Sequence, residues 1–185
     1  EYGKQDLQHL IIVKKLNYKI LQDIKPLTGR WSKKTKKLPL VLTEEELRDG
    51  RDVFPLEFLN IKLNHNILHG KGILENLEFD KKHIRKELEF EFRSKLINLR
   101  QGFLEVKSKS EVKILINKAI PTLLPILNGL LFLKNIEIPN SLEEIFNLVS
   151  QHYKVKVDVL KELQDSKEDP DYYIKELIII LSTLG

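Results

Sequence analysis

Short apolar runs separated by polar stretches begin the chain and predict strands that alternate with helices. Residues 10–16 are rich in branched side chains and precede a polar break, which indicates a buried strand. Residues 17–25 place apolar side chains at helical spacing, and we expect Pro26 and Gly29 to end or interrupt that helix. Residues 38–42 resume a strand, so the chain is predicted to start as β-α-β.

The next stretch continues the alternation. Thr43 followed by Glu46 is a capping-box pattern, which predicts the start of a short helix. Residues 54–61 and 66–69 are interpreted as further strands or extended pieces, with a turn at Gly70 where glycine makes a tight bend easy.

After Asp80 the apolar period changes to that of a helix. Asp80 is a candidate N-cap, and a long amphipathic helix is predicted beyond it. Its apolar positions recur every three or four residues: Ile84, Leu88, Phe92, Leu96, Leu99 and Phe103.

Three more helices are predicted towards the end of the chain. Ser110 is expected to cap a second long helix, running to about residue 135, that Pro121 and Pro125 kink. Ser141 starts a third helix, and residues 155–163 are compatible with either a short helix or a strand. Asp169 precedes a proline at the first position of the last helix, predicted over residues 171–184.

These elements predict an α+β fold. A small mixed sheet with flanking helices would come first, and an antiparallel bundle of about four or five helices would follow it. The change of period at residues 75–80 marks the expected boundary, which divides the chain into residues 1–76 and 77–185.

Composition narrows the function classes. The 185 residues suffice to bury a core, and the absence of cysteine excludes disulfides, thiolate metal sites and cysteine nucleophiles. The net charge of +4 permits anionic partners without requiring them. No continuous apolar run approaches the ~20 residues that cross a bilayer, so we expect a cytoplasmic protein with no membrane partner. The sequence has no Gly-x-Ser-x-Gly elbow, Walker loop or dinucleotide fingerprint.

Two acidic segments carry the candidate chemistry. Asp6 and Gln8 precede the first predicted strand, and alternation along a strand puts them on one face. Glu57 is predicted to project towards them from a neighbouring strand. Converging carboxylates are what divalent metal ions require, and Gln8 stands where a second acid is needed.

The segment Asp6-Leu7-Gln8, with the apolar run after it, resembles the second signature of the DNA polymerase β-type nucleotidyltransferase superfamily. That signature places an aspartate, an apolar residue and a second aspartate on a strand, after a Gly-Ser motif. The chain begins at Glu1, so we expect the Gly-Ser motif and whatever else precedes Glu1 to be missing from it.

A wider stretch, about residues 38–100, is similar to a group of uncharacterised bacterial proteins that carry a nucleotidyltransferase-like domain followed by a helical one. The similarity rests on residues 40–47, residues 52–61 with Glu57 in the position of the third carboxylate, Leu68-His69-Gly70, and residues 89–101. It implies that Asp6 and Glu57 are catalytic and bind Mg²⁺. The implied activity transfers a nucleoside monophosphate from a nucleoside triphosphate to an unknown acceptor.

Three further residues are candidate substrate contacts. Arg93 and Arg100 lie on one face of the long helix, two turns apart, where guanidinium groups could bind a triphosphate bidentately. Salt bridges to Glu89 and other helical acids are the alternative for these arginines. His65 could contact substrate near the cleft. On a strand it would stand ~13 Å from His69, too far for both to bind one metal ion.

Two other functions remain open on the sequence alone. One is a noncatalytic nucleotide- or protein-binding regulatory module, comparable with the helical bundles that pair with minimal nucleotidyltransferases in toxin-antitoxin operons; Gln8 favours it. The other is nucleic-acid binding through the basic residues 30–37 around Trp31, since cations and an aromatic side chain suit a single strand.

Overall fold

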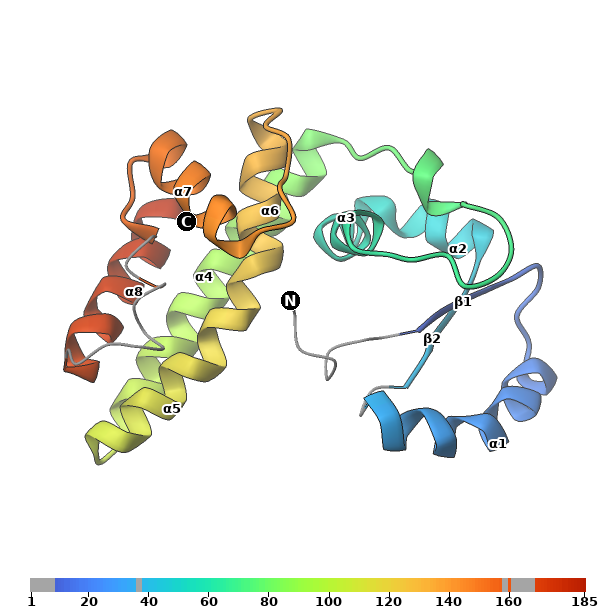
Figure 1. Cartoon of the computed structure of the whole chain (residues 1–185), viewed down its shortest axis with the longest axis horizontal. Helices are drawn as coiled ribbons and strands as arrows, with labels where there is room; N and C mark the ends of the chain where they lie inside the picture. The colour runs from blue at the N-terminus through green and yellow to red at the C-terminus, as the bar shows by residue number, and fades with distance from the viewer. Residues whose placement is uncertain (1–8, 36–37, 158–159, 161–168) are drawn as a thin grey trace.

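The computed structural model describes residues 9–35, 38–157, 160 and 169–185, and for residues 30–35 it describes the backbone only (Figure 1). Most of this part of the chain is helical, with a small parallel sheet of two strands. The sheet lies at one end of the molecule in Figure 1, and the helices of the second half of the chain lie at the other.

The sheet consists of β1 (Leu10–Val13) and β2 (Leu40–Thr43), joined by helix α1 (Tyr18–Thr35). Leu10 pairs with Leu40 and Val13 with Thr43 in parallel register. Both predicted strands are therefore confirmed. The prediction that Pro26 ends or interrupts the first helix is wrong, because α1 continues to Thr35 with Pro26 inside it. Proline removes only its own donor, and on an exposed helix water can satisfy the carbonyl that is left.

The capping box at Thr43 is confirmed and begins the short helix α2 (Glu44–Asp49), which leads through the 3₁₀ turn η1 (Gly50–Asp52) into α3 (Pro55–Leu63). The predicted strand over residues 54–61 is wrong, since this segment is α3. Its buried side chains explain why: they stand at positions 55, 56, 58 and 59, which is a helical spacing, and Pro55 occupies the first turn, where its missing donor costs nothing.

Residues 66–69 form no strand either. They belong to an irregular connection that leads to the 3₁₀ turn η2 (Leu74–Asn76). The predicted turn at Gly70 is confirmed, and its φ of 94° is in the left-handed region that favours glycine.

The long helix α4 (Lys81–Glu105) is confirmed, and the Asp80 side chain accepts a hydrogen bond from the Lys82 amide at 2.7 Å. The next helix, α5 (Lys109–Ala119), is capped by Ser108 rather than by the predicted Ser110. The two prolines do interrupt the apolar helix, because α5 gives way to the 3₁₀ turn η3 (Ile120–Leu123) before α6 (Leu124–Leu133).

The chain ends with α7 (Leu142–Tyr153) and α8 (Pro170–Leu184). Ser141 caps α7 and Asp169 caps α8, as predicted. Helix α8 forms in spite of three consecutive isoleucines, because it buries Tyr173, Ile174, Leu177, Ile180 and Leu181 at helical spacing. The predicted segment 155–163 lies partly outside the described residues; in its described part Val155 is buried in irregular structure, and Val157 and Leu160 are buried in 3₁₀-helical backbone.

Two apolar clusters hold these elements together. The larger cluster gathers side chains of α3 to α8, and in it α4 packs against α3, α5, α6 and α8. The smaller cluster centres on Leu47, Phe58, Leu74 and Leu77, with partly buried side chains of β1 and β2 against it. Helix α3 belongs to both, since Leu56 and Leu59 enter the larger cluster and Phe58 the smaller.

The segment Lys109–Leu133, which comprises α5, η3 and α6, is long and apolar enough to span a membrane by length and composition, although the sequence analysis found no continuous apolar run of that size. In this structure 44% of its apolar window is buried, and Ile126, Leu127, Leu130 and Leu131 belong to the larger core cluster. Helices that form the core of a protein commonly have this composition.

Candidate functional site

The structure places the predicted site residues on three different elements. Asp6 and Gln8 lie outside the described residues, in the segment just before β1. Glu57 is exposed in the first turn of α3 and not on a strand, so alternation along neighbouring strands cannot bring it to Asp6. Arg93 and Arg100 are exposed on α4.

His65 lies in the connection just after α3 and is half-buried. Its Nδ1 is 2.8 Å from the carbonyl oxygen of Lys62. This contact occupies one ring nitrogen and leaves Nε2 as the nitrogen that could meet a substrate.

The part of the chain that the structure describes has a polar groove of about 710 Å³ that the sequence analysis did not anticipate. It lies where α2 and η1 meet the segment leading into α4. Its lining residues are Arg48, Asp49, Arg51, Asp52, Glu78, Phe79, Asp80 and His83, which include none of Glu57, His65, Arg93 or Arg100. The signal in the sequence was the dense run of charges over residues 44–52.

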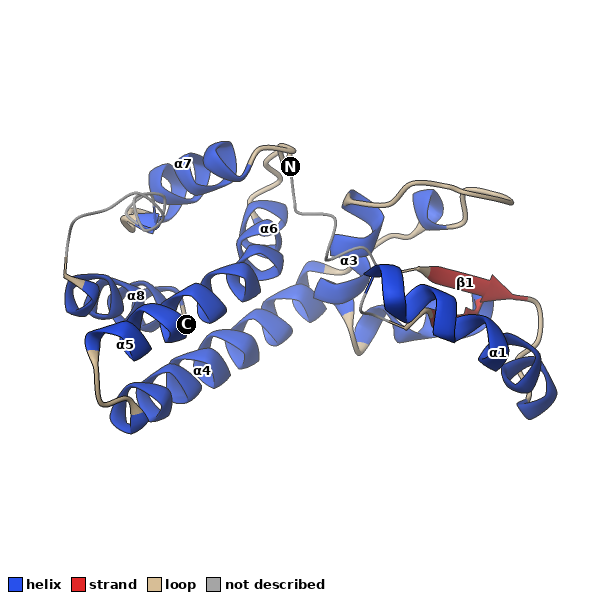
Figure 2. Cartoon of the chain, turned by 60° about the horizontal axis from the view of Figure 1, so that its bottom comes forward, coloured by secondary structure: helices blue, strands red, loops and turns tan. Residues whose placement is uncertain are grey.

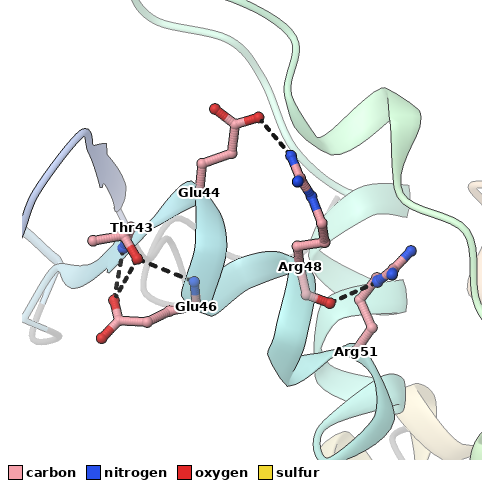
Figure 3. A network of polar contacts seen from close by, with 5 residues as sticks. All are labelled: Thr43, Glu44, Glu46, Arg48 and Arg51. Atoms are coloured by element: carbon pink, nitrogen blue, oxygen red, sulfur yellow. Dashed lines mark hydrogen bonds and ion pairs between the residues drawn. The ribbon is translucent and has the colours of Figure 1, made fainter.

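Local hydrogen bonds hold one wall of the groove in place (Figure 3). The Glu46 amide donates to Thr43 Oγ1 at 3.0 Å, and the Thr43 amide donates to Glu46 Oε2 at 2.7 Å. One turn later, Arg48 contacts Glu44 at 3.2 Å on the surface. The capping box of Thr43 and Glu46 fixes the direction in which the chain leaves β2.

Arg51 is held more firmly than Arg48. Its Nε donates to the Arg48 carbonyl at 2.7 Å, and its Nη1 donates to the Glu78 carbonyl at 3.3 Å. Arg51 therefore joins η1 to the segment before α4, across the groove. Arg48 has 63% of its side chain exposed and is free to turn towards a ligand.

The groove carries charges of both signs. Arg48 and Arg51 are permanently charged and could contact a phosphate, but four carboxylates, those of Asp49, Asp52, Glu78 and Asp80, line the same groove and oppose an anion there. The facing carboxylates do not form a metal centre, because no three His, Cys, Asp or Glu side chains of the described residues are grouped closely enough to bind one ion. The groove lies beyond Thr43, at the carboxyl end of β2.

A group of carboxylates at the start of α3 has a clear electrostatic consequence. The Glu87 carboxylate of α4 accepts a hydrogen bond from the Leu56 amide at 2.6 Å. Burial raises the pKa of Glu87; the bond from Leu56 opposes that shift, and the charges of Glu91 and Glu57 add to it. The immediate effect of the Glu57 carboxylate is thus to disfavour the charged form of Glu87.

A buried amide pair links α3 to α6. Asn60 Nδ2 donates to the carbonyls of Leu56 and Pro125, so its Oδ1 faces Asn128 and accepts from Asn128 Nδ2 at 2.7 Å. Asn128 is 2% exposed, and its own Oδ1 has no partner in the described structure. Asn128 lines a cavity of about 30 Å³ beside α6, which has room for about one water molecule.

Comparison with known proteins gives no further assignment: no family model, curated protein or solved structure matches this chain.

Proposed function

We propose that the chain is a nucleotidyltransferase-like protein that binds a nucleoside triphosphate and transfers a nucleoside monophosphate to an acceptor. The observation that carries this proposal is β1, a strand that begins at Leu10, two residues after Gln8, and pairs with β2. The superfamily signature that this segment resembles requires its acids at such a strand. In this proposal Asp6 and Glu57 would hold Mg²⁺, which would supply positive charge to the reacting phosphates, and His65, Arg93 and Arg100 are candidate contacts to the triphosphate.

A second candidate function is a noncatalytic nucleotide-binding module. The groove favours it, because Arg48 and Arg51 offer cations to a phosphate without any contribution from Asp6. The helical position of Glu57 also favours this candidate, because an exposed side chain on α3 is not held by a strand beside Asp6. Binding at the groove would regulate a partner rather than support transfer.

One experiment distinguishes the two candidate sites, because they use different residues. We would titrate ATP, GTP, CTP and UTP into the protein by calorimetry, with and without Mg²⁺, and compare the wild type with Asp6→Ala and Arg48→Ala. Arg48 is a suitable probe of the groove because its side-chain contact, with Glu44, is on the surface. We expect binding that requires Mg²⁺ and weakens at least about tenfold, or about 1.4 kcal/mol, in Asp6→Ala while Arg48→Ala binds normally.

Each other outcome contradicts the first proposal in a distinct way. Binding that persists without Mg²⁺ and is lost in Arg48→Ala would support the noncatalytic module. The absence of binding by folded protein for all four nucleotides would overturn both candidates. A Glu57→Gln variant separates metal binding from the rest of the site, since it should lower metal-dependent binding and leave metal-free binding unchanged.

A further inference from the structure

Helix α4 exposes a stripe of large apolar side chains to solvent. Phe90, Ile97 and Leu104 are 67%, 53% and 84% exposed. They stand seven residues apart, which is nearly two helical turns, so they lie along one face. We call these three residues the α4 stripe.

The α4 stripe points away from the core of its own molecule. The buried side chains of α4, Ile84, Leu88, Phe92 and Leu99, lie on the opposite side of the helix from the stripe. Helix α4 lies along an edge of the molecule, with α5 and α8 on one side of it (Figure 2). Apolar side chains repeated every seven residues along one face of a helix are the pattern by which two helices pack together.

Three basic residues border the stripe on one side, and two acidic residues with an asparagine between them border it on the other. One side of the stripe is basic and consists of Lys86, Arg93 and Arg100. Lys86 stands four residues before Phe90, and Arg93 and Arg100 stand three residues after Phe90 and Ile97. Glu91, Asn98 and Glu105 follow the other side, each one residue after a stripe residue. All are exposed except Glu91, which is partly buried and contacts Lys95 at 3.1 Å.

This pattern is complementary to itself in one orientation only. When two copies of such a helix pack in parallel, the basic border of each helix faces the acidic border of the other, which brings Arg100 close to Glu105 of the second copy and Lys86 close to Glu91. In an antiparallel pair the basic borders would face each other and repel. We propose that the α4 stripe binds the same stripe of a second copy of this chain, with the two helices parallel.

The proposed contact is small, so the association should be weak. Residues 86–105 form about 30 Å of helix, and three apolar side chains from each copy bury less area than the ~800 Å² per partner of a standard interface. Polar side chains, Glu87, Ser94 and Gln101, occupy the neighbouring heptad positions, and the Glu87 carboxylate, which accepts from the Leu56 amide, opposes close approach of the second copy at that end. We therefore expect a dissociation constant of about 10–100 µM. This inference does not depend on the proposed nucleotide site.

Sedimentation equilibrium over a range of protein concentrations tests the contact. The wild type should be a reversible dimer, and Ile97→Glu should raise its dissociation constant at least about tenfold, since a charge would be buried between the helices. Leu27→Glu is the matched control, because Leu27 is 48% exposed on α1, well away from α4 in Figure 1. A wild type that stays monomeric throughout, or a dimer that Ile97→Glu leaves intact, would overturn the proposal.

The absence of native cysteine allows a direct test of orientation. Ser94→Cys and Gln101→Cys, made separately, should each form a disulfide between two copies, because in a parallel pair identical positions approach to the Cα separation of about 4–7 Å that a disulfide needs. An antiparallel pair allows at most one of the two cross-links, and that result would contradict the parallel arrangement.

Reversal of charge provides a second check. Arg100→Glu alone and Glu105→Arg alone should each weaken the dimer, and the double variant should restore it. If the single variants weaken the dimer and the double variant does not restore it, the predicted ion pair between Arg100 and Glu105 of the second copy is contradicted. Binding of the stripe to anionic lipid vesicles by a protein that stays monomeric would assign the face to a membrane surface instead and overturn the proposal.

Discussion

The Glu87 side chain of α4 caps the start of a different helix, α3. The residue before α3, Phe54, offers no side-chain cap, and the Leu56 amide is one of the donors that a helix leaves unpaired at its start. Glu87 reaches it from α4, 31 positions along the chain. The contact fastens α3 to α4, but it holds a carboxylate in a partly buried place beside two other acids.

A pH dependence of stability follows from this placement. Because the folded-state pKa of Glu87 is above its ordinary value of 4.5, the folded protein holds this proton more tightly than the unfolded chain. The stabilisation from Glu87 is therefore complete below that ordinary value and is lost as the pH rises through the folded-state pKa. Glu87→Gln keeps an acceptor for the Leu56 amide without the charge.

We expect Glu87→Gln to match the wild type in acid and to become more stable than the wild type as the pH approaches neutrality. Urea unfolding at a series of pH values measures this difference. Glu137→Gln is the control, because Glu137 is exposed in the loop after α6 and loses the same charge. A constant difference across the pH range for Glu87→Gln would show that its charge has no effect on folding.

Residue-level features of this kind could be predicted from the sequence only where they are local. The caps at Thr43, Asp80 and Asp169 were predicted because each lies within three residues of its partner. The bond from Asn128 to Asn60 joins residues 68 positions apart, and nothing in either local pattern indicates it. The role of Glu57 as a metal ligand stays a prediction, since Asp6 lies outside the described residues.

At the level of elements, the capping box at Thr43 is where the strand β2 becomes helix α2. Thr43→Ala removes the acceptor of the Glu46 amide, and we expect it to lower the free energy of unfolding by about 1 kcal/mol. Thr43→Ser keeps the hydroxyl and should recover most of the loss. Urea denaturation of the three proteins gives both values, and an equal loss in Thr43→Ser would assign the effect to the methyl group of threonine instead.

The errors in the predicted elements share a physical cause. Residues 54–61 alternate apolar and polar side chains over their first few positions, as a strand would, and tertiary packing decided between the two periods. Helix α3 buries positions 55, 56, 58 and 59 and leaves Glu57 exposed. This spacing lets the helix pack against both apolar clusters at once. Long segments with sustained helical periods, α4 and α8, left no such choice and were predicted correctly.

At the scale of the whole molecule, α3 connects the smaller apolar cluster to the larger one. Sequence period could not reveal this, because it shows which residues of an element are buried and not which cluster they enter. Leu56 and Leu59 pack with the C-terminal helices, although they belong to the predicted N-terminal unit of residues 1–76. The division at residue 76 stays a prediction about folding, and the structure supplies a way to test it.

Two glycine substitutions are expected to change stability in opposite directions, and the one at Gly129 acts at the packing of α3. A Cβ at Gly129 of α6 would lie 2.3 Å from Leu56 Cδ2 and 3.1 Å from Leu88 Cδ2, so Gly129→Ala should wedge α6 away from α3 and destabilise the protein by about 1–3 kcal/mol. A Cβ at Gly29 of α1 meets nothing within 4 Å. Gly29→Ala should therefore stabilise the protein by up to about 1 kcal/mol through helix propensity.

The way the two halves respond decides whether they unfold together. Amide hydrogen exchange resolved by segment follows residues 1–76 and 77–185 separately. We expect both segments to lose protection at the same urea concentration, and Gly129→Ala to move both to lower urea, because α3 ties the smaller cluster to the larger one. If Gly129→Ala lowered the protection of residues 77–185 alone and left that of residues 1–76 unchanged, the two segments would be independent folding units, and the packing of α3 would be too weak to couple them.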